Sequence, residues 1–348
     1  MSTIFDLVTP FNVANKWKEN TLERQPYYGE ALFEEKKQLG IEINGITGNK
    51  PKIKPLNLSS YDAKVIPLSR EAFNKITTEI PFFKNSLPLD EKTRQELNKV
   101  LATGNRQYID AVMNVYYNDS NTLLNNASVT REAMRMMILT TGVIAFENNG
   151  GAVSYDYGVS NKVSKQWKDT SDSKADPVSD IEALMDTIEN KSGVRPTKIL
   201  MNSVTLNNLR KLTNIRNAIL KDSVSGVFVS KTQVISYLQS ELQATIVIYN
   251  KGYTDIESGA FTKFVPDNII SLYPEGYIGK GVFGTTPEES DLMSGATSAK
   301  VEIVDMGVAI TVTKETDPVN VVTKVSESYL PTLDNPDAIG IITATFGE

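Results

Sequence analysis

The sequence contains no cysteine and no histidine among its 348 residues. Without cysteine, the chain cannot form a disulfide, a thiolate nucleophile or a cysteine-ligated zinc site. Without histidine, it lacks the commonest general base, the usual transition-metal ligand and a member of the serine-type triad. Chemistry based on carboxylate, lysine or tyrosine side chains stays open. The two absences favour a structural protein over an enzyme.

Basic runs and long apolar segments are also absent. The net charge is −6, and the lysines and arginines are scattered rather than gathered into a run that could neutralise successive phosphates. Tight nucleic-acid binding is therefore not indicated. No charged N-terminal region precedes an apolar segment, and no window reaches membrane-spanning length. We expect a protein that is made and kept in the cytoplasm, without a membrane partner.

The remaining composition is that of a globular protein. The chain is 40% hydrophobic and 22% charged, and it is long enough for one large or two modest domains. Along the chain, strand-like alternation is followed by a helix-rich stretch from 89 to 146, by mixed helices and strands up to 273 and by a β-rich region from 300 onward. This order predicts an α+β protein.

The first 39 residues show neither a helical nor a strand period. Five aromatic residues are spread through them: Phe11, Trp17, Tyr27, Tyr28 and Phe33. Two interpretations stay open for this segment. It is either an arm packed on its own domain or an arm that lies across a neighbouring subunit.

Residues 40–83 alternate in the β manner around glycines and prolines, which predicts a hairpin-like excursion. Lys50, Lys52 and Lys54 are two residues apart, so an extended strand places them on one face. The prolines beside them disfavour a central strand. From the residues alone, an edge strand protected by lysine is the favoured interpretation.

Local signals mark several helices. One helical stretch ends before Gly104, a second covers 109–116, and a third runs from Ser128 to about Gly142. After a polar linker, Asp176 and Pro177 form a helix start, and a glycine follows that helix's end. Further elements are expected as strands at 198–201, 245–249, 261–265 and 269–273 and as helices after a Ser203 cap, at 215–221 and at 230–242.

One motif suggests nucleotide chemistry. Gly279–Gly284 matches G-x-G-x-x-G and follows an apparent strand. The next residues, 285–290, supply no convincing helix whose N-terminus could hold a pyrophosphate. We therefore favour a glycine-rich loop that changes strand direction. An α/β nucleotide-binding enzyme stays as an alternative, and no residue is assigned a catalytic role.

The most informative motif lies near the C-terminus. Asp317-Pro318 and Asn335-Pro336 flank a β-branched run, which predicts a strand between two turns. Periodicity alone would allow an ordinary edge strand. The order Leu330-Pro-Thr-Leu-Asp-Asn-Pro-Asp-Ala-Ile339 resembles the C-terminal signature of lambda-like phage major capsid proteins, the phage major capsid protein E family. Residues 131–142 and 167–182 resemble this family too.

The resemblance implies the capsid fold shared by tailed phages, herpesviruses and encapsulins. It implies an N-terminal arm in 1–39 and an extended β loop in 40–83. A peripheral domain with a long spine helix would occupy 84–166 and 300–348, and an axial domain would occupy 167–299. Because arm and loop would reach a neighbouring subunit, we predict intersubunit contacts for Trp17, Tyr27, Tyr28, Lys50, Lys52 and Lys54.

The function implied by the resemblance is assembly. The subunit would associate as hexamers and pentamers into an icosahedral shell that encloses double-stranded DNA without sequence-specific binding. A separate scaffolding protein and a portal protein are implied partners, and a decoration protein is allowed. No cofactor is implied. The shell would be made in the host cytoplasm and become the capsid of the virion.

Three other classes remain open beside the capsid interpretation. The first is an encapsulin-type compartment shell. The second is a tail-tube or other phage β protein, which the helix-rich stretch disfavours. The third is an α/β enzyme using Gly279–Gly284.

Overall fold

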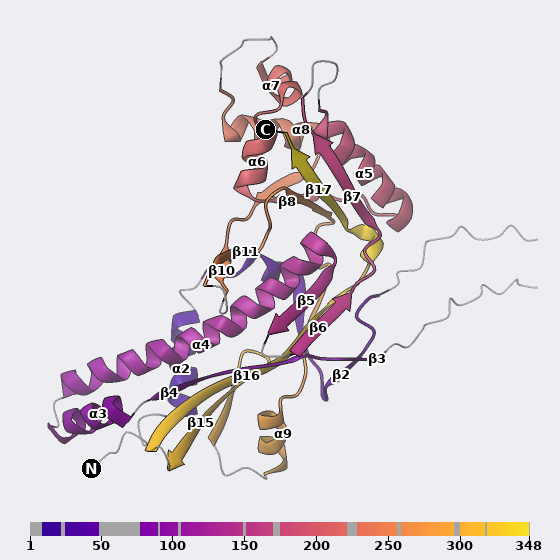
Figure 1. Cartoon of the computed structure of the whole chain (residues 1–348). Helices are drawn as coiled ribbons and strands as arrows, with labels where there is room; N and C mark the ends of the chain where they lie inside the picture. The colour runs from indigo at the N-terminus through magenta and orange to yellow at the C-terminus, as the bar shows by residue number, and fades with distance from the viewer. Residues whose placement is uncertain are drawn as a thin grey trace, which may run out of the picture. The chain divides into compact units, whose positions relative to one another are not determined.

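The computed structural model divides the chain into two compact units. It describes residues 9–21, 25–48, 77–89, 91–103, 106–148, 151–169, 175–220, 228–255, 259–295, 300–316 and 319–347. The first unit comprises Met1–Ile43, Glu79–Met136 and Gly279–Pro331. The second unit comprises Asn44–Thr78, Met137–Ile278 and Thr332–Glu348. The cartoon in Figure 1 labels the elements of both units.

A six-stranded sheet forms the centre of the first unit. Its order is β1-β13-β16-β15-β14, and β4 also pairs with β16. β1 is parallel to β13, whereas β15 is antiparallel to both β14 and β16, and β4 is antiparallel to β16. The strands are β1 (Phe33–Lys37), β4 (Phe82–Leu89), β13 (Gly279–Phe283), β14 (Lys300–Val304), β15 (Val308–Thr316) and β16 (Val319–Leu333).

β16 confirms the strand predicted from the β-branched run near the C-terminus. It is an interior strand of the sheet rather than an edge strand, because it has neighbours on both sides. The turn predicted at its end is also present, since Asn335 caps a short 3-10 helix, η2 (Pro336–Ala338). The other predicted turn, Asp317-Pro318, lies outside the described residues.

One long helix is present where the sequence predicted separate helical stretches, and its residues up to Met136 belong to the first unit. α4 (Arg106–Thr141) is continuous over 36 residues. Residues 117–127, between the two predicted stretches, continue the helix, and Thr122 Oγ1 there donates to the Asn118 carbonyl four residues earlier. The predicted end is confirmed, because Gly142 follows with a φ of +72°.

The N-terminal segment also corrects the expectation that it has no regular period. Residues Pro10–Thr21 form α2, which packs on β14 and β15. Val13, Ala14 and Trp17 lie on one helical face and are buried. The remaining helices of the unit are η1 (Tyr28–Ala31), α3 (Glu91–Thr103) and α9 (Pro287–Ser294).

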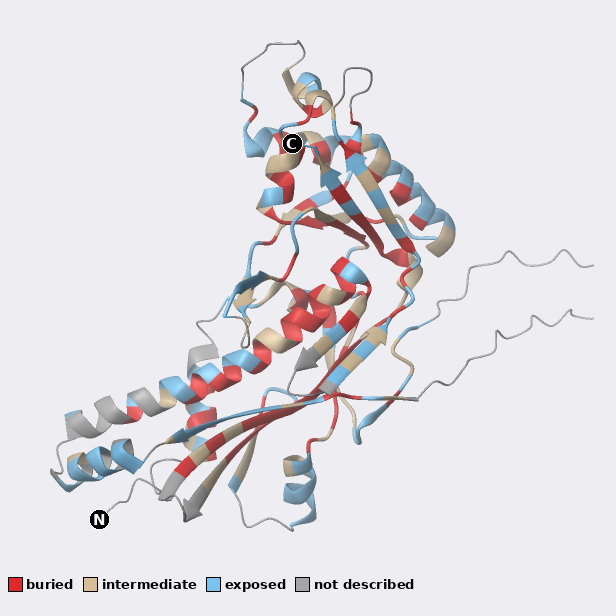
Figure 2. Cartoon of the chain, in the orientation of Figure 1, coloured by how far each residue is buried: buried red, intermediate tan, exposed pale blue. Residues whose placement is uncertain are grey.

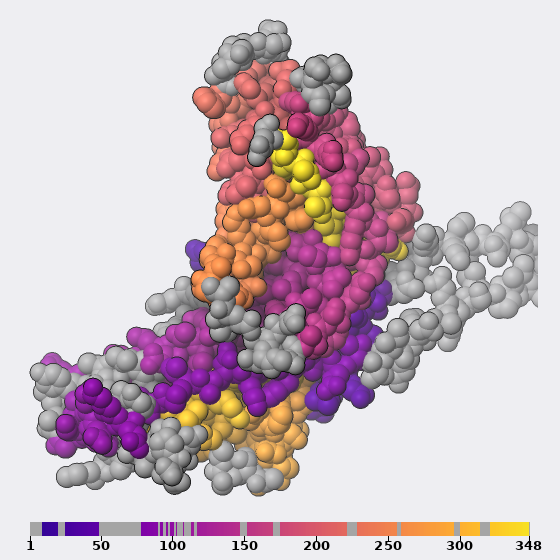
Figure 3. Space-filling model, viewed as in Figure 1, coloured from indigo at the N-terminus to yellow at the C-terminus, as the bar shows by residue number. Residues whose placement is uncertain are grey.

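The second unit is built around a five-stranded sheet of order β7-β17-β12-β8-β9. β7 is parallel to β17 and β8 is parallel to β9, while β12 runs antiparallel to β17 and β8. In Figure 3, β17 is the yellow strip between magenta and orange residues. The strands are β7 (Asn161–Trp167), β8 (Lys198–Met201), β9 (Thr245–Ile248), β12 (Ile269–Tyr273) and β17 (Gly340–Phe346).

Helices cover this sheet and bury its core. α5 (Pro177–Ser192) turns Ile181, Leu184, Met185 and Ile188 inward. Figure 2 shows buried positions in red along this helix. The other helices are α6 (Ser203–Leu209), α7 (Thr213–Leu220) and α8 (Lys231–Leu242). Three two-stranded sheets complete the fold: β2 (Glu42–Asn44) with β3 (Thr77–Glu79), β5 (Val143–Asn148) with β6 (Gly151–Asp156), and β10 (Gly252–Thr254) with β11 (Phe261–Lys263).

The predicted helix caps of the second unit are confirmed with one correction. Asp176 accepts a hydrogen bond from the Ser179 N–H and caps α5 (Pro177–Ser192). Ser230 caps α8 through a complete capping box. The cap of α6 is Asn202 rather than Ser203, because the Asn202 side chain accepts the third backbone N–H of that helix.

The two units divide the chain differently from the domain boundaries that we expected. Residues 300–348 were expected as one peripheral block, but the division falls after Pro331, and β17 lies in the sheet of the second unit. Residues 137–166 also belong to the second unit. The names arm, loop, peripheral and axial domain therefore stay predictions.

Candidate functional site

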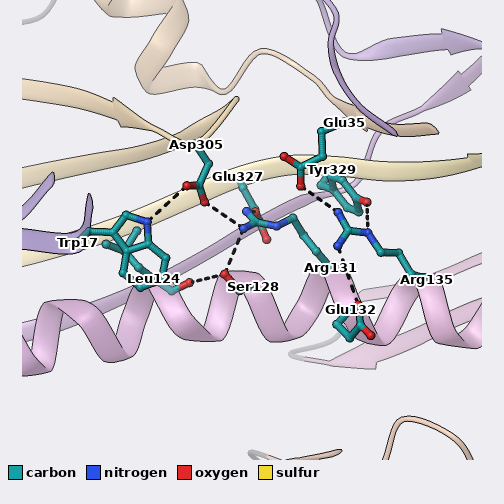
Figure 4. A network of polar contacts seen from close by, with 10 residues as sticks. All are labelled: Trp17, Glu35, Leu124, Ser128, Arg131, Glu132, Arg135, Asp305, Glu327 and Tyr329. Atoms are coloured by element: carbon teal, nitrogen blue, oxygen red, sulfur yellow. Dashed lines mark hydrogen bonds and ion pairs between the residues drawn. The ribbon is translucent and has the colours of Figure 1, made fainter. Parts of the chain in front are cut away.

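A polar network lies along α4 in the first unit (Figure 4). Arg131 Nη1 donates to Glu327 Oε2 at 2.8 Å. Arg131 Nη2 donates to Asp305 Oδ2 and to Ser128 Oγ, both at 3.1 Å. The Arg131 side chain is 5% exposed, so the structure buries a guanidinium group together with one carboxylate, that of Glu327, while the Asp305 carboxylate is partly exposed.

Arg135 makes the second half of the network. Its Nε donates to the Tyr329 hydroxyl at 2.8 Å, and its Nη2 donates to Glu35 Oε1 at 3.0 Å. The two arginines are four residues apart on a helix, about 6 Å. Glu327 and Tyr329 are two residues apart on a strand, about 6.6 Å. The two spacings match, so helix and strand pair side chain for side chain.

Two further contacts bring the N-terminal segment into the network. Both carboxylate oxygens of Glu132 accept the Gly29 N–H, at 3.0 and 3.1 Å. A Cβ at Gly29 would lie 2.5 Å from Glu132 Oε2, so a side chain there would clash. Trp17 Nε1 donates to Asp305 Oδ1 at 3.4 Å. The network thus ties α2, η1 and β1 to α4 and β16.

Burial and charge set the ionisation of these groups. Burial lowers the pKa of Arg131, but Glu327 and Asp305 raise it by more, so the net shift is upward. Burial and Arg131 lower the pKa of Arg135, but Tyr329, Glu132 and Glu35 raise it by more, so the net shift is again upward. Burial raises the pKa of the Tyr329 hydroxyl. Both guanidinium groups are therefore cations and Tyr329 is a neutral donor and acceptor at neutral pH.

Each of the two arginines also lies over an aromatic ring. The Arg131 guanidinium carbon lies 5.4 Å from the centre of the Phe283 ring, and that of Arg135 lies 5.4 Å from the Tyr329 ring. Such contacts stabilise a cation that has lost its water. The arrangement holds elements together and presents no group to a substrate. No cluster of metal-ligating side chains is found within the described ranges.

A second polar contact set attaches α9 to the sheet of the first unit. Glu289 pairs with Lys37 at 2.5 Å, and Glu288 pairs with Lys324 at 2.6 Å. Burial raises the pKa of Glu288, but bonds from Lys324 and Ser326 outweigh it, so the net shift is downward. α9 buries none of its residues, so ion pairs rather than apolar packing hold it.

The glycine motif does not form the loop that the sequence predicted. Gly279–Phe283 is strand β13, between β1 and β16. A Cβ at Gly281 would lie 2.5 Å from the Tyr329 hydroxyl, so the absence of a side chain here allows Tyr329 to pack against the β13 backbone. The sequence also missed α9, which starts after Thr286. With the motif inside a sheet, the first glycines cannot form a phosphate-binding turn.

The six residues predicted to make intersubunit contacts do not share one environment in the structure. Trp17 is 3% exposed and lies in the network of its own unit. Tyr27 and Tyr28 are half-buried at η1. Lys50, Lys52 and Lys54 lie outside the described residues. Their intersubunit role stays a prediction.

The sequence did contain a signal for the network that we did not use. Arg131 and Arg135 are four residues apart in a stretch, 131–139, that is apolar except for them and Glu132, and Glu327 and Tyr329 alternate on a valine-rich strand. Charged residues at core positions of a helix and a strand imply partners. The partners themselves lie 100 to 196 residues away along the chain.

None of the described helices has the length and apolar character needed to cross a membrane.

Comparison with solved structures identifies the fold. The proposed capsid protein of a prophage of Escherichia coli CFT073 is 14% identical, with a TM-score of 0.52 over 77% of this chain and 78% of that one. A phage-related protein of Bordetella bronchiseptica RB50 is 11% identical, with a TM-score of 0.52 over 96% and 97%. A protein of the satellite phage P4 procapsid is 9% identical, with a TM-score of 0.50 over 98% and 92%.

The sequence comparisons agree with the fold. No curated protein sequence matches the chain. The sequence model of the family described as phage major capsid protein E matches residues 14–344, nearly the whole length. The predicted resemblance and the predicted α+β capsid fold are thereby confirmed. With its capsid fold, its buried network and this match, the chain belongs to the phage major capsid protein E family.

Proposed function

We propose that this protein is the major capsid subunit of a tailed bacteriophage and assembles as hexamers and pentamers into an icosahedral shell around double-stranded DNA. The family match over residues 14–344 carries this proposal. The buried network supports it, because it joins segments far apart in sequence into one unit. Such a unit suits a subunit that must repeat the same contacts many times.

Exposed apolar side chains supply surface for these contacts. Phe82 and Leu87 of β4 are each 40% exposed, and Phe261 and Tyr277 of the second unit are each 62% exposed. Such side chains provide apolar area that a neighbouring subunit can bury. Each contact is weak alone, but a closed shell sums them over all of its subunits.

The subdivision of the subunit is part of the proposal. The N-terminal arm is 1–39 and the extended loop is 40–83. The peripheral domain is 84–166 with 300–348, and the axial domain is 167–299. The spine helix of the peripheral domain corresponds to α4 (Arg106–Thr141).

The proposed partners follow from assembly. They are a separate scaffolding protein, a portal protein and, on the finished shell, a decoration protein. The satellite phage P4 procapsid includes a size determination protein, which supports a separate assembly-directing partner. The subunits assemble in the host cytoplasm and end in the virion.

Electron microscopy tests the proposal. The full-length protein is expressed alone and together with the neighbouring scaffolding gene, and both preparations are imaged by negative stain. Closed shells, capsomers or tubes are expected in at least one of them. DNA inside shells recovered from phage would separate a virion capsid from a cargo compartment. A uniform monomer or dimer in both preparations would reject the proposal.

A further inference from the structure

Glu327 is the carboxylate of the network with the least compensation. Its side chain is 2% exposed. Oε2 accepts the hydrogen bond from Arg131, but Oε1 has no hydrogen-bond partner among the described residues. A buried carboxylate oxygen without a donor is costly in its charged form.

The charge of the whole network adds to this cost. Two guanidinium groups face four carboxyl groups, those of Glu35, Glu132, Asp305 and Glu327. If all six groups were ionised, the network would carry two surplus negative charges. Glu35 and Asp305 are 31% and 27% exposed, so water compensates them. Glu327 has no such access to bulk solvent.

A small cavity, partly open to solvent, lies beside Glu327, between β4, α4 and β16. Its polar lining comes from Lys84, Asn85, Asn126, Thr130, Ser326 and Glu327. The cavity volume that water-sized spheres can occupy is about 30 Å³. A site needs about 10–15 Å³ of this volume to hold one water, and that water then requires two to four polar partners. Size and lining both suit a water.

We propose that Glu327 is a proton-binding site of the subunit and that the folded first unit holds this carboxyl group in its neutral form. A hydronium ion reaching the cavity gives its proton to Oε1, forming the Oε1–H bond and leaving a water molecule behind. The new O–H group points into the cavity, where that water accepts its hydrogen bond. Oε2 keeps the hydrogen bond from Arg131.

The charged groups around Glu327 are consistent with this assignment. Burial is the largest influence and raises its pKa, and Asp305 raises it further, whereas Arg131 and Arg135 lower it. The net shift is upward. Arg131 still has Asp305 as an anionic partner when Glu327 is neutral. The titratable or charged groups facing it are Arg131, Glu132 and Arg135 of α4, Asp305 after β14, Glu35 of β1, Tyr329 of β16 and Lys84 of β4.

The sign of the pH dependence follows from the raised pKa. The folded subunit binds one more proton than the unfolded chain between the ordinary glutamate pKa, about 4.3, and the raised value. The resulting stability is fully present below the ordinary value and is lost as the pH rises through the raised one. Across that window, the folding equilibrium constant falls by up to tenfold per pH unit.

Two measurements on the full-length protein test the proposal, with Glu327→Gln as the variant and Glu275→Gln as the control. Glu275 is 74% exposed and pairs with Lys198 on the surface. Infrared spectra should show a protonated carboxyl band above the ordinary glutamate pKa in the wild type and the control, but not in Glu327→Gln. Urea unfolding should show the tenfold-per-unit pH dependence in the same two proteins only.

Three results would overturn the proposal. The first is a carboxyl band that is absent above the ordinary glutamate pKa or that persists in Glu327→Gln. The second is an equal pH dependence of unfolding in Glu327→Gln and the wild type. The third is failure of Glu327→Gln to fold, because the charge would then be required. None of these readouts depends on shell formation.

Discussion

Replacing Arg131 by methionine should destabilise the first unit strongly. The substitution removes the cation but leaves Glu327 buried and Asp305 only 27% exposed. Breaking a buried ion pair by removing one partner costs about 3–5 kcal/mol. We expect a loss in this range above the raised pKa of Glu327, where its carboxylate is charged. The loss should shrink as the pH falls through that pKa, because the neutral carboxyl group needs no cation.

The two tryptophans allow this loss to be assigned to one unit. Trp17 is buried in the first unit and Trp167 in the second, and the chain contains no others. In a Trp167→Phe background, urea unfolding followed by fluorescence reports on the first unit. In a Trp17→Phe background, the transition of the second unit should not change with Arg131→Met.

A matched arginine provides the control. Arg195 also contacts two carboxylates, Asp186 and Glu189, but its side chain is 37% exposed. Exposed pairs contribute about 0.2–1 kcal/mol, so Arg195→Met should cost no more than that in the second unit. Above the raised pKa of Glu327, adding Glu327→Gln to Arg131→Met should recover at least half of the loss, because it removes the unpaired buried charge. A cost below about 1 kcal/mol for Arg131→Met, or no recovery in the double variant, would refute the reasoning.

Three further perturbations address other parts of the chain. Gly29→Ala should lower the melting temperature of the first unit, because its Cβ would meet Glu132 Oε2 at 2.5 Å; an unchanged thermal transition would contradict this. Asp176→Ala should cost the second unit about 1 kcal/mol by loss of the α5 cap, read from Trp167 fluorescence. Deleting residues 44–56, of which 49–56 lie outside the described residues, should leave a folded subunit that cannot close shells; normal particles in electron micrographs would reject that expectation.

Local features of the fold could be predicted from the sequence because their causes are local. Asp176, Pro177 and Gly193 define both ends of α5 within a few residues, and the structure confirms them. The strand after 319 followed from β-branched residues in the same way. In each case, backbone preference and the final structure agree.

Non-local features could not be predicted by the same means. The close packing of Gly281 against Tyr329 cannot be distinguished by sequence pattern from glycine's freedom in a loop. The polar residues 117–127 interrupt the apolar pattern of the sequence, although α4 continues through them and Thr122 Oγ1 bonds to the Asn118 carbonyl within it. The network needs Arg131 to meet Glu327 across 196 residues of sequence, which only the assembled sheet brings about.

The positions of β16 and β17 have a consequence for the order of synthesis. β16 is an interior strand of the first sheet, and β17 is an interior strand of the second. During translation, the first sheet cannot close until the ribosome has passed residue 333, and the second cannot close until it has passed residue 346. A chain that ends before residue 319 therefore lacks an interior strand in each unit, and we expect such fragments to be kept out of the growing shell because neither unit can complete its fold.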